Sequence, residues 1–169
     1  GTLFGKNTTA GAINVTTRRP GFTPETEFEI NYGTIGFVQA KGSITGPLLG
    51  GKVAGRLSFS GTQRDGNVYN AKTQDLVNDI NNLGVRGQVL FTPSDRVAIT
   101  LAMDGTRQRV RGSTQVFAGV TPTLRPANRQ FDTIAAEVGY VPPTRDAFDR
   151  ITDVDSPLRS NQGLGGASL

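Results

Sequence analysis

The sequence predicts an all-β protein: an antiparallel up-and-down meander that is part of a large transmembrane β-barrel and forms an open, curved sheet in this chain. Three observations predict this fold. Apolar and polar residues alternate in successive segments, the connections between these segments differ in length in a regular way, and one face of the predicted sheet carries charges. No run approaches the roughly 18 consecutive apolar residues of a membrane helix. Barrel strands need only about 9 to 11 alternating residues to cross a bilayer.

Period-two alternation begins near residue 26, where Phe28, Ile30 and Tyr32 take one face and acidic residues take the other. The pattern recurs as far as Val97, Ile99, Leu101 and Met103. Leu90 departs from it, because it falls on the polar face of its strand. The predicted strands lie near residues 26–33, 36–46, 53–64, 84–92, 97–109 and 162–169.

Turn residues separate these strands. Gly33 and Thr34 predict a tight turn, and 47–51 and 93–96 hold the Pro, Gly, Ser and Asp typical of short turns. Long polar connections are predicted at 65–83, with a short helical turn near 74–80, and at 110–161. Apart from the first connection, the long ones fall at one end of the sheet, as the external loops of outer-membrane barrels do.

The two faces of the predicted sheet differ in chemistry. One is apolar, and the strands supply no second sheet to cover it, so contact with lipid is expected. The aromatic residues Phe28, Tyr32, Phe59 and Phe91 fit this face better than a stacking platform for bases. The opposite face suits a water-filled or plugged lumen, since it carries Glu27, Glu29, Lys41, Arg56, Arg86 and Asp104.

The composition removes most enzyme chemistry. The 169 residues include no Cys and no His, so thiolate nucleophiles, imidazole acid/base groups and the usual zinc ligands are absent, and we expect neither a metal site nor a cofactor. The net charge of +4 is spread over scattered arginines, which predicts no nucleic-acid partner. Two glycine loops, GTLFGKNT from Gly1 and GPLLGGK from Gly46, depart from the phosphate-binding motif and precede no helix. We therefore expect that the protein is not an enzyme.

The opening GTLFGKNTTAGAINVTTRRP, residues 1–20, resembles the end of the plug domain of TonB-dependent outer-membrane receptors, and LGVRGQVLFTPSDRVAITLAMD, residues 83–104, resembles their first barrel strands. The resemblance implies that residues 1–22 end a plug and residues 23–169 begin a barrel of about 22 strands, so the chain is expected to be a fragment. It also implies an outer-membrane location and import of a scarce ligand, above all a ferric siderophore. The implied partners are the TonB energy-coupling protein, outer-membrane lipid and lipopolysaccharide.

Candidate site residues fall in three groups. The plug motif, with a structural role, comprises Gly1, Phe4, Gly5, Lys6, Asn7, Gly11 and Asn14. Arg18 and Arg19 are candidates for pairing with Glu27 or Glu29 to seat the plug, the alternative being a solvated linker. Candidates for ligand contact in the long external loop are Phe117, Arg125, Arg129, Phe131 and Tyr140.

A second function class stays open at this point. The same strands fit a soluble extracellular β-sandwich that binds glycans or another polymer. That fold requires a second sheet to cover the apolar face.

Overall fold

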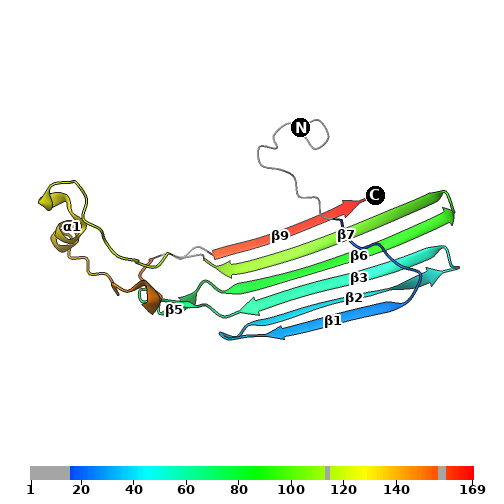
Figure 1. Cartoon of the computed structure of the whole chain (residues 1–169), viewed down its shortest axis with the longest axis horizontal. Helices are drawn as coiled ribbons and strands as arrows, with labels where there is room; N and C mark the ends of the chain where they lie inside the picture. The colour runs from blue at the N-terminus through cyan, green and yellow to red at the C-terminus, as the bar shows by residue number, and fades with distance from the viewer. Residues whose placement is uncertain (1–15, 113–114, 156–158) are drawn as a thin grey trace.

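The computed structural model describes residues 16–112, 115–155 and 159–169 (Figure 1). Its main body is one sheet of six strands in the order β1-β2-β3-β6-β7-β9, in which every neighbouring pair is antiparallel. The prediction of an all-β, antiparallel fold is confirmed. The sheet is open, with β1 and β9 at its edges (Figure 1). The strands are β1 (Glu25–Tyr32), β2 (Val38–Leu49), β3 (Val53–Arg64), β6 (Ile80–Ser94), β7 (Val97–Arg111) and β9 (Arg159–Ser168).

Two short turns close one end of the sheet. Gly50 and Gly51 both have positive φ, 56° and 65°, which lets the chain reverse within the three residues 50–52 between β2 and β3. Asp95 and Arg96 connect β6 to β7. The other end carries the connection 33–37 and both long connections, so the long loops gather at one end of the sheet (Figure 1).

The long connections contain a second, smaller sheet. Its strands are β4 (Val68–Asn70), β5 (Asp75–Val77) and β8 (Ile151–Thr152), in the order β5-β4-β8. The expected helical turn near 74–80 is wrong: residues 75–77 form β5, because β4 supplies an antiparallel partner for their backbone. The second connection also holds η1 (Ala127–Arg129), α1 (Phe131–Glu137) and η2 (Ala147–Asp149). No helix in the described part of the chain is both long enough and apolar enough to cross a membrane.

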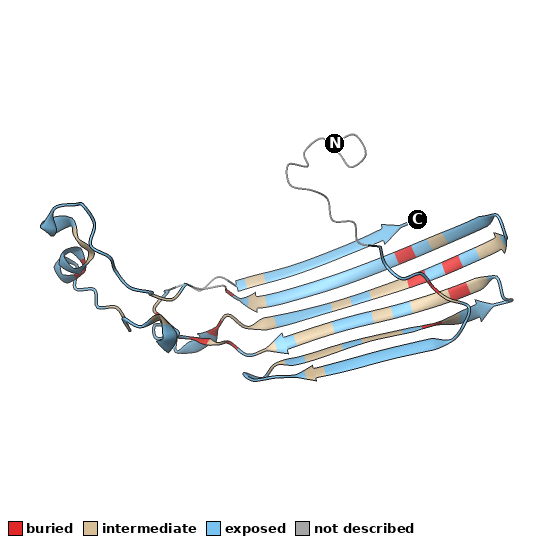
Figure 2. Cartoon of the chain, viewed as in Figure 1, coloured by how far each residue is buried: buried red, intermediate tan, exposed pale blue. Residues whose placement is uncertain are grey.

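Buried residues of the main sheet gather where residues 16–24 cross it (Figure 2). We call residues 16–22 the strap. Ala54 of β3 is 0% exposed and Leu90 of β6 is buried beside it in the register. Pro20 of the strap is buried as well. Leu90 therefore departs from the alternating pattern because it lies on the covered part of an otherwise exposed polar face.

Candidate functional site

The first candidate surface is the apolar face of the main sheet, which lies open to its surroundings. Met103 at its centre is 63% exposed, and no element of the described chain forms a layer over it. The face extends from Val53 and its cross-strand neighbours to Leu83 and its cross-strand neighbours. Val53 lies at the end of the sheet with the short turns, which we call the turn end, and Leu83 lies near the end with the long loops, which we call the loop end. Burying such a surface would gain about 25 cal/mol for each Å² removed from water. Its exposed large residues include Phe28, Ile30, Ile44, Leu57, Phe59, Leu83, Val85, Val89, Phe91, Ile99, Leu101 and Met103.

A pair of aromatic rings packs over Gly42 on this face. Phe28 of β1 and Phe59 of β3 both lie opposite Gly42 of β2. Their ring centroids are 6.2 Å apart, and a Cβ on Gly42 would come within 2.6 Å of the Phe59 ring. Gly42 is therefore required for the close approach of the rings over β2.

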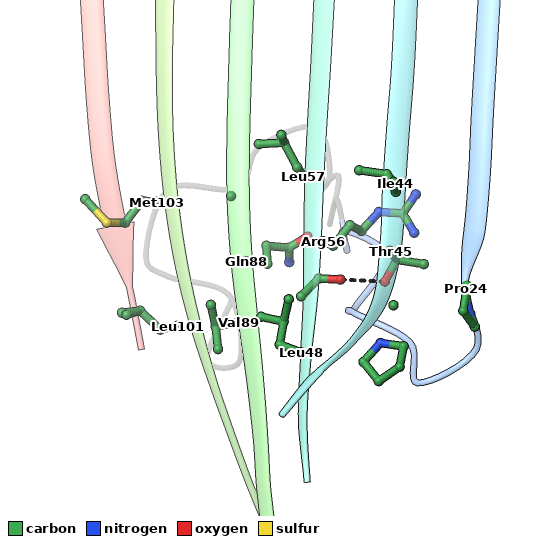
Figure 3. Close-up of a pocket in the computed structure, with 14 residues that line it drawn as sticks. Pro24, Ile44, Thr45, Leu48, Arg56, Leu57, Gln88, Val89, Leu101 and Met103 are labelled. Carbon is green, nitrogen blue, oxygen red and sulfur yellow. Dashed lines mark hydrogen bonds between the residues drawn. The ribbon is translucent and has the colours of Figure 1, made fainter. Parts of the chain in front are cut away.

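The same face has a shallow apolar hollow of about 680 Å³ near the turn end (Figure 3). Gly87 is among its lining residues, and a Cβ added there would meet nothing within 4 Å. Most side chains around it are hydrocarbon or thioether groups, and Thr45, Arg56 and Gln88 also line it. The hollow can therefore take apolar chains but offers few polar groups to orient a ligand. Those labelled in Figure 3 include Ile44, Leu48, Leu57, Val89, Leu101 and Met103.

The second candidate surface is the polar face, where charged groups of adjacent strands pair. The Arg56 side chain is only 8% exposed; its Nη2 donates to Ser43 Oγ at 2.7 Å and lies 3.6 Å from Glu27 Oε2. Arg86 Nη1 lies 3.0 Å from Asp104 Oδ1. Glu29 accepts a hydrogen bond from Asn31 at 2.6 Å and lies 3.7 Å from Lys41. The face is thus a network of charged and amide groups suited to water or a polar plug.

The strap is fastened to this polar face at Thr45. The Thr45 hydroxyl accepts a hydrogen bond from Gly21 N at 2.8 Å and donates one to Gly55 O at 2.8 Å, the latter drawn in Figure 3. The structure also brings Arg18 and Glu27 together, at 2.6 Å, and Arg18 reaches Glu25 at 2.8 Å. All three side chains are about half exposed, so these ion pairs contribute about 0 to 1 kcal/mol each. Thr45 is the stronger anchor.

The other candidates for seating the plug are Glu29 and Arg19. Glu29 pairs with Lys41 on the sheet rather than with the strap. Arg19 is exposed on the strap. The predicted plug motif falls in residues 1–15, outside the described part of the chain; it comprises Gly1, Phe4, Gly5, Lys6, Asn7, Gly11 and Asn14.

Three of the five predicted ligand-contact residues meet in the long loop. The rings of Phe117 and Phe131 are 5.5 Å apart, and those of Phe131 and Tyr140 are 6.5 Å apart and almost perpendicular. Edge-to-face packing of this kind stabilises the cluster itself. Arg125 and Arg129 are exposed, and their backbone atoms, not their guanidinium groups, make the nearby loop hydrogen bonds.

The hydroxyl of Tyr140 ties this aromatic cluster to the end of the loop. A hydrogen bond to Asp153, together with partial burial and the charge of that carboxylate, raises the pKa of the Tyr140 phenol above 10.0. Because the folded pKa is raised, the contact stabilises the loop below pH 10 and is lost as pH rises through the higher folded value.

Asp153→Asn is therefore expected to return the pKa of Tyr140 toward 10.0 and to loosen the loop at a lower pH. Carbon-13 NMR of labelled tyrosine rings measures the titration, and Tyr140→Phe identifies the resonance. An unchanged Tyr140 titration in Asp153→Asn would show that the Asp153 hydrogen bond does not set this pKa.

Sequence reasoning missed the residue that joins the two long loops. Asn70 is completely buried; its Nδ2 donates to Val154 O at 2.9 Å, and its Oδ1 accepts from the backbone N of Lys72 and Thr73. The signal was the turn sequence after β4, because Asn readily bonds to backbone groups two and three residues ahead. Thr45 and Gly21 gave no signal, since their contact spans separate segments.

No group of three or more metal-ligating side chains occurs within residues 16–112, 115–155 and 159–169. No protein-family model matches this sequence. No solved structure matches the chain.

Proposed function

We propose that the chain is part of a TonB-dependent outer-membrane receptor that imports a scarce ligand, with ferric siderophores as the ligand class we favour. In this proposal the main sheet is a section of the barrel wall. The observation that carries it is the two-faced sheet: one face is broadly apolar and exposed, and the other carries paired charges. Such a difference between the faces is expected of a barrel wall, in which one face contacts lipid and the other faces a polar, plugged lumen.

The strap supports the assignment of the polar face to the lumen. Residues 16–22 precede β1 and lie on the polar face, fastened by the Gly21 to Thr45 hydrogen bond. This is where the end of a plug would pass before the chain enters the wall. The resemblance of residues 1–20 to the end of a plug supports the same placement.

The loop end of the sheet would face the exterior. It carries both long connections, and these are joined by the small sheet β5-β4-β8. The aromatic cluster of Phe117, Phe131 and Tyr140 lies in this region and is our candidate surface for the first contact with a ligand.

The edges of the sheet would pair with further strands. Both β1 and β9 have only one neighbour in the main sheet. Barrels need about eight strands before their interior can close around side chains. We therefore place β1 and β9 next to wall strands that this sheet does not contain.

A soluble β-sandwich is the alternative. It requires a second sheet over the apolar face, whereas the second sheet of the described chain is small and joins the long loops instead. A glycan-binding sandwich is accordingly the weaker proposal.

Single-cysteine labelling tests the membrane proposal, and the absence of native Cys makes every label unique. The chain is refolded into phosphatidylcholine vesicles with an environment-sensitive dye at Leu57→Cys, Val85→Cys or Met103→Cys. Matched controls carry the dye on the opposite face, at Ser58→Cys or Thr106→Cys. We expect blue-shifted emission, quenched by spin-labelled acyl chains, at the first three positions alone.

Blue-shifted emission that acyl-chain quenchers do not reach would indicate a protein cover and favour the sandwich. Equal emission from both faces would contradict the barrel-wall proposal. The ligand class needs a separate test: growth of iron-starved cells on supplied siderophores, with and without the gene that encodes this chain.

A further inference from the structure

Arginines continue the outward face of the sheet beyond its apolar band. Arg107, Arg109 and Arg111 occupy alternate positions of β7, in phase with Met103, and therefore project from the same face. The β7–β9 register places Arg159 directly opposite Arg111. Four arginine side chains thus project from the loop end of the face that is otherwise apolar.

Three of these arginines line a hollow of about 310 Å³, which we call the arginine hollow. It lies across the ends of β6, β7 and β9. The lining residues are Arg109, Arg111 and Arg159, with Asp79, Asn81, Val110, Ser160 and Asn161.

Positive charge in the arginine hollow exceeds negative charge. Among the lining residues that the structure describes, Asp79 alone bears a carboxylate, and Arg111 engages both of its oxygens. Arg111 N donates to Oδ1 at 2.5 Å, and Nε lies 3.8 Å from Oδ2. Arg109 and Arg159 are exposed and have no such partner among the lining residues. Because Asp79 offsets the charge of Arg111, Arg109 and Arg159 leave two uncompensated positive charges, which favour an anion in the arginine hollow.

The depth of the arginine hollow fits a lipid headgroup. Met103 lies in the middle row of the apolar band, and Arg109 is six residues further along β7. At about 3.4 Å per residue and a tilt of about 40°, six residues rise roughly 15 Å. This is about half of the roughly 30 Å hydrocarbon core, so the arginines reach the level where headgroups begin.

We propose that the arginine hollow binds the phosphate groups of a phosphorylated outer-leaflet lipid whose acyl chains lie along the apolar face. This inference rests on the proposed function, because it needs lipid on that face. Guanidinium groups recognise phosphate oxygens through paired hydrogen bonds, and Asn81 and Asn161 supply further amide donors. The adjoining apolar residue Leu83 marks where hydrocarbon contact would begin.

The test measures binding of diphosphoryl lipid A to the chain in a neutral maltoside detergent. Arg109→Gln combined with Arg159→Gln removes two charges from the arginine hollow and leaves the Arg111 to Asp79 contact in place. Lys52→Gln combined with Arg96→Gln removes two charges at the turn end and is the matched control. We expect at least tenfold weaker binding for the first double variant and less than twofold for the control.

Two comparisons identify what is bound. The unaltered chain should bind the same lipid without phosphates at least tenfold more weakly, and millimolar inorganic phosphate should not displace diphosphoryl lipid A. Equal losses in both double variants would overturn the site, as would displacement by inorganic phosphate. The dye measurements in phosphatidylcholine vesicles decide the membrane proposal independently, because those vesicles contain no phosphorylated glycolipid. If the dyes report lipid contact while the two double variants bind lipid A equally well, the proposed lipid site in the arginine hollow is wrong and the barrel-wall proposal is retained.

Discussion

A lysine in place of Met103 is expected to lower the free energy of unfolding of the lipid-reconstituted chain by about 2 to 4 kcal/mol. This is the cost of placing a charged side chain near the bilayer midplane on the lipid-facing side of a barrel strand. Met103 is suited to the test because it is 63% exposed and its cross-strand neighbours are Gly87 and Ala167. Little packing is therefore removed when the side chain changes, and the charge accounts for most of the effect.

Thr106→Lys is the matched control. Thr106 lies three residues along the same strand, projects from the polar face and has the uncharged neighbours Gly84 and Leu164. We expect a change below about 1 kcal/mol, as for most exposed substitutions. Guanidinium unfolding in phosphatidylcholine vesicles, followed by circular dichroism, measures both variants. Equal free energies for Met103→Lys and Thr106→Lys would contradict lipid contact at the apolar face.

Thr45→Val is expected to release the strap and to cost about 1 to 3 kcal/mol, because it removes the hydroxyl that accepts the hydrogen bond of Gly21 N. Valine has nearly the shape of threonine, so packing is kept. Thr45 is buried, and its hydroxyl links Gly21 N of the strap to Gly55 O of β3. Loss of these bonds should expose the strap to proteases.

Trypsin reports the release directly. It cuts after Arg18 but not between Arg19 and Pro20, so the strap offers one susceptible bond. We expect cleavage there to be at least fivefold faster in Thr45→Val, whereas Thr62→Val is the control. Thr62 accepts a hydrogen bond from Gln39 at 3.0 Å within the sheet and makes none to the strap. Unchanged cleavage in Thr45→Val would show that the strap is held by other contacts, such as the Arg18 ion pairs.

The main sheet could be predicted because each strand carries its own signal. Alternation in residues 53–64 reflects two different surroundings on the two faces of β3, and both ends of that range coincide with β3. Leu90 did not fit, because its cover comes from a segment about 70 residues earlier in the chain. A pattern confined to one strand holds no information about such a cover.

The loop structure was less accessible to prediction. β5 has three residues, too few for a period to emerge, and its conformation depends on pairing with β4. Phe117, Phe131 and Tyr140 could be named as a group by their place in one loop, but their mutual packing depends on the path of the loop between them. The Gly21 to Thr45 contact was beyond sequence reasoning for the same reason.

The pairing of β4 with β8 bears on the order of folding. Every contact between neighbours in the first part of the main sheet can form from a hairpin, whereas the Asn70 to Val154 bond joins residues 84 apart. The entropy lost on closing a chain segment grows with its length, so this closure is costly until β7 has already brought the segments near each other. The small sheet should therefore form last, and a chain trapped before that step would have a complete main sheet with both long loops still open.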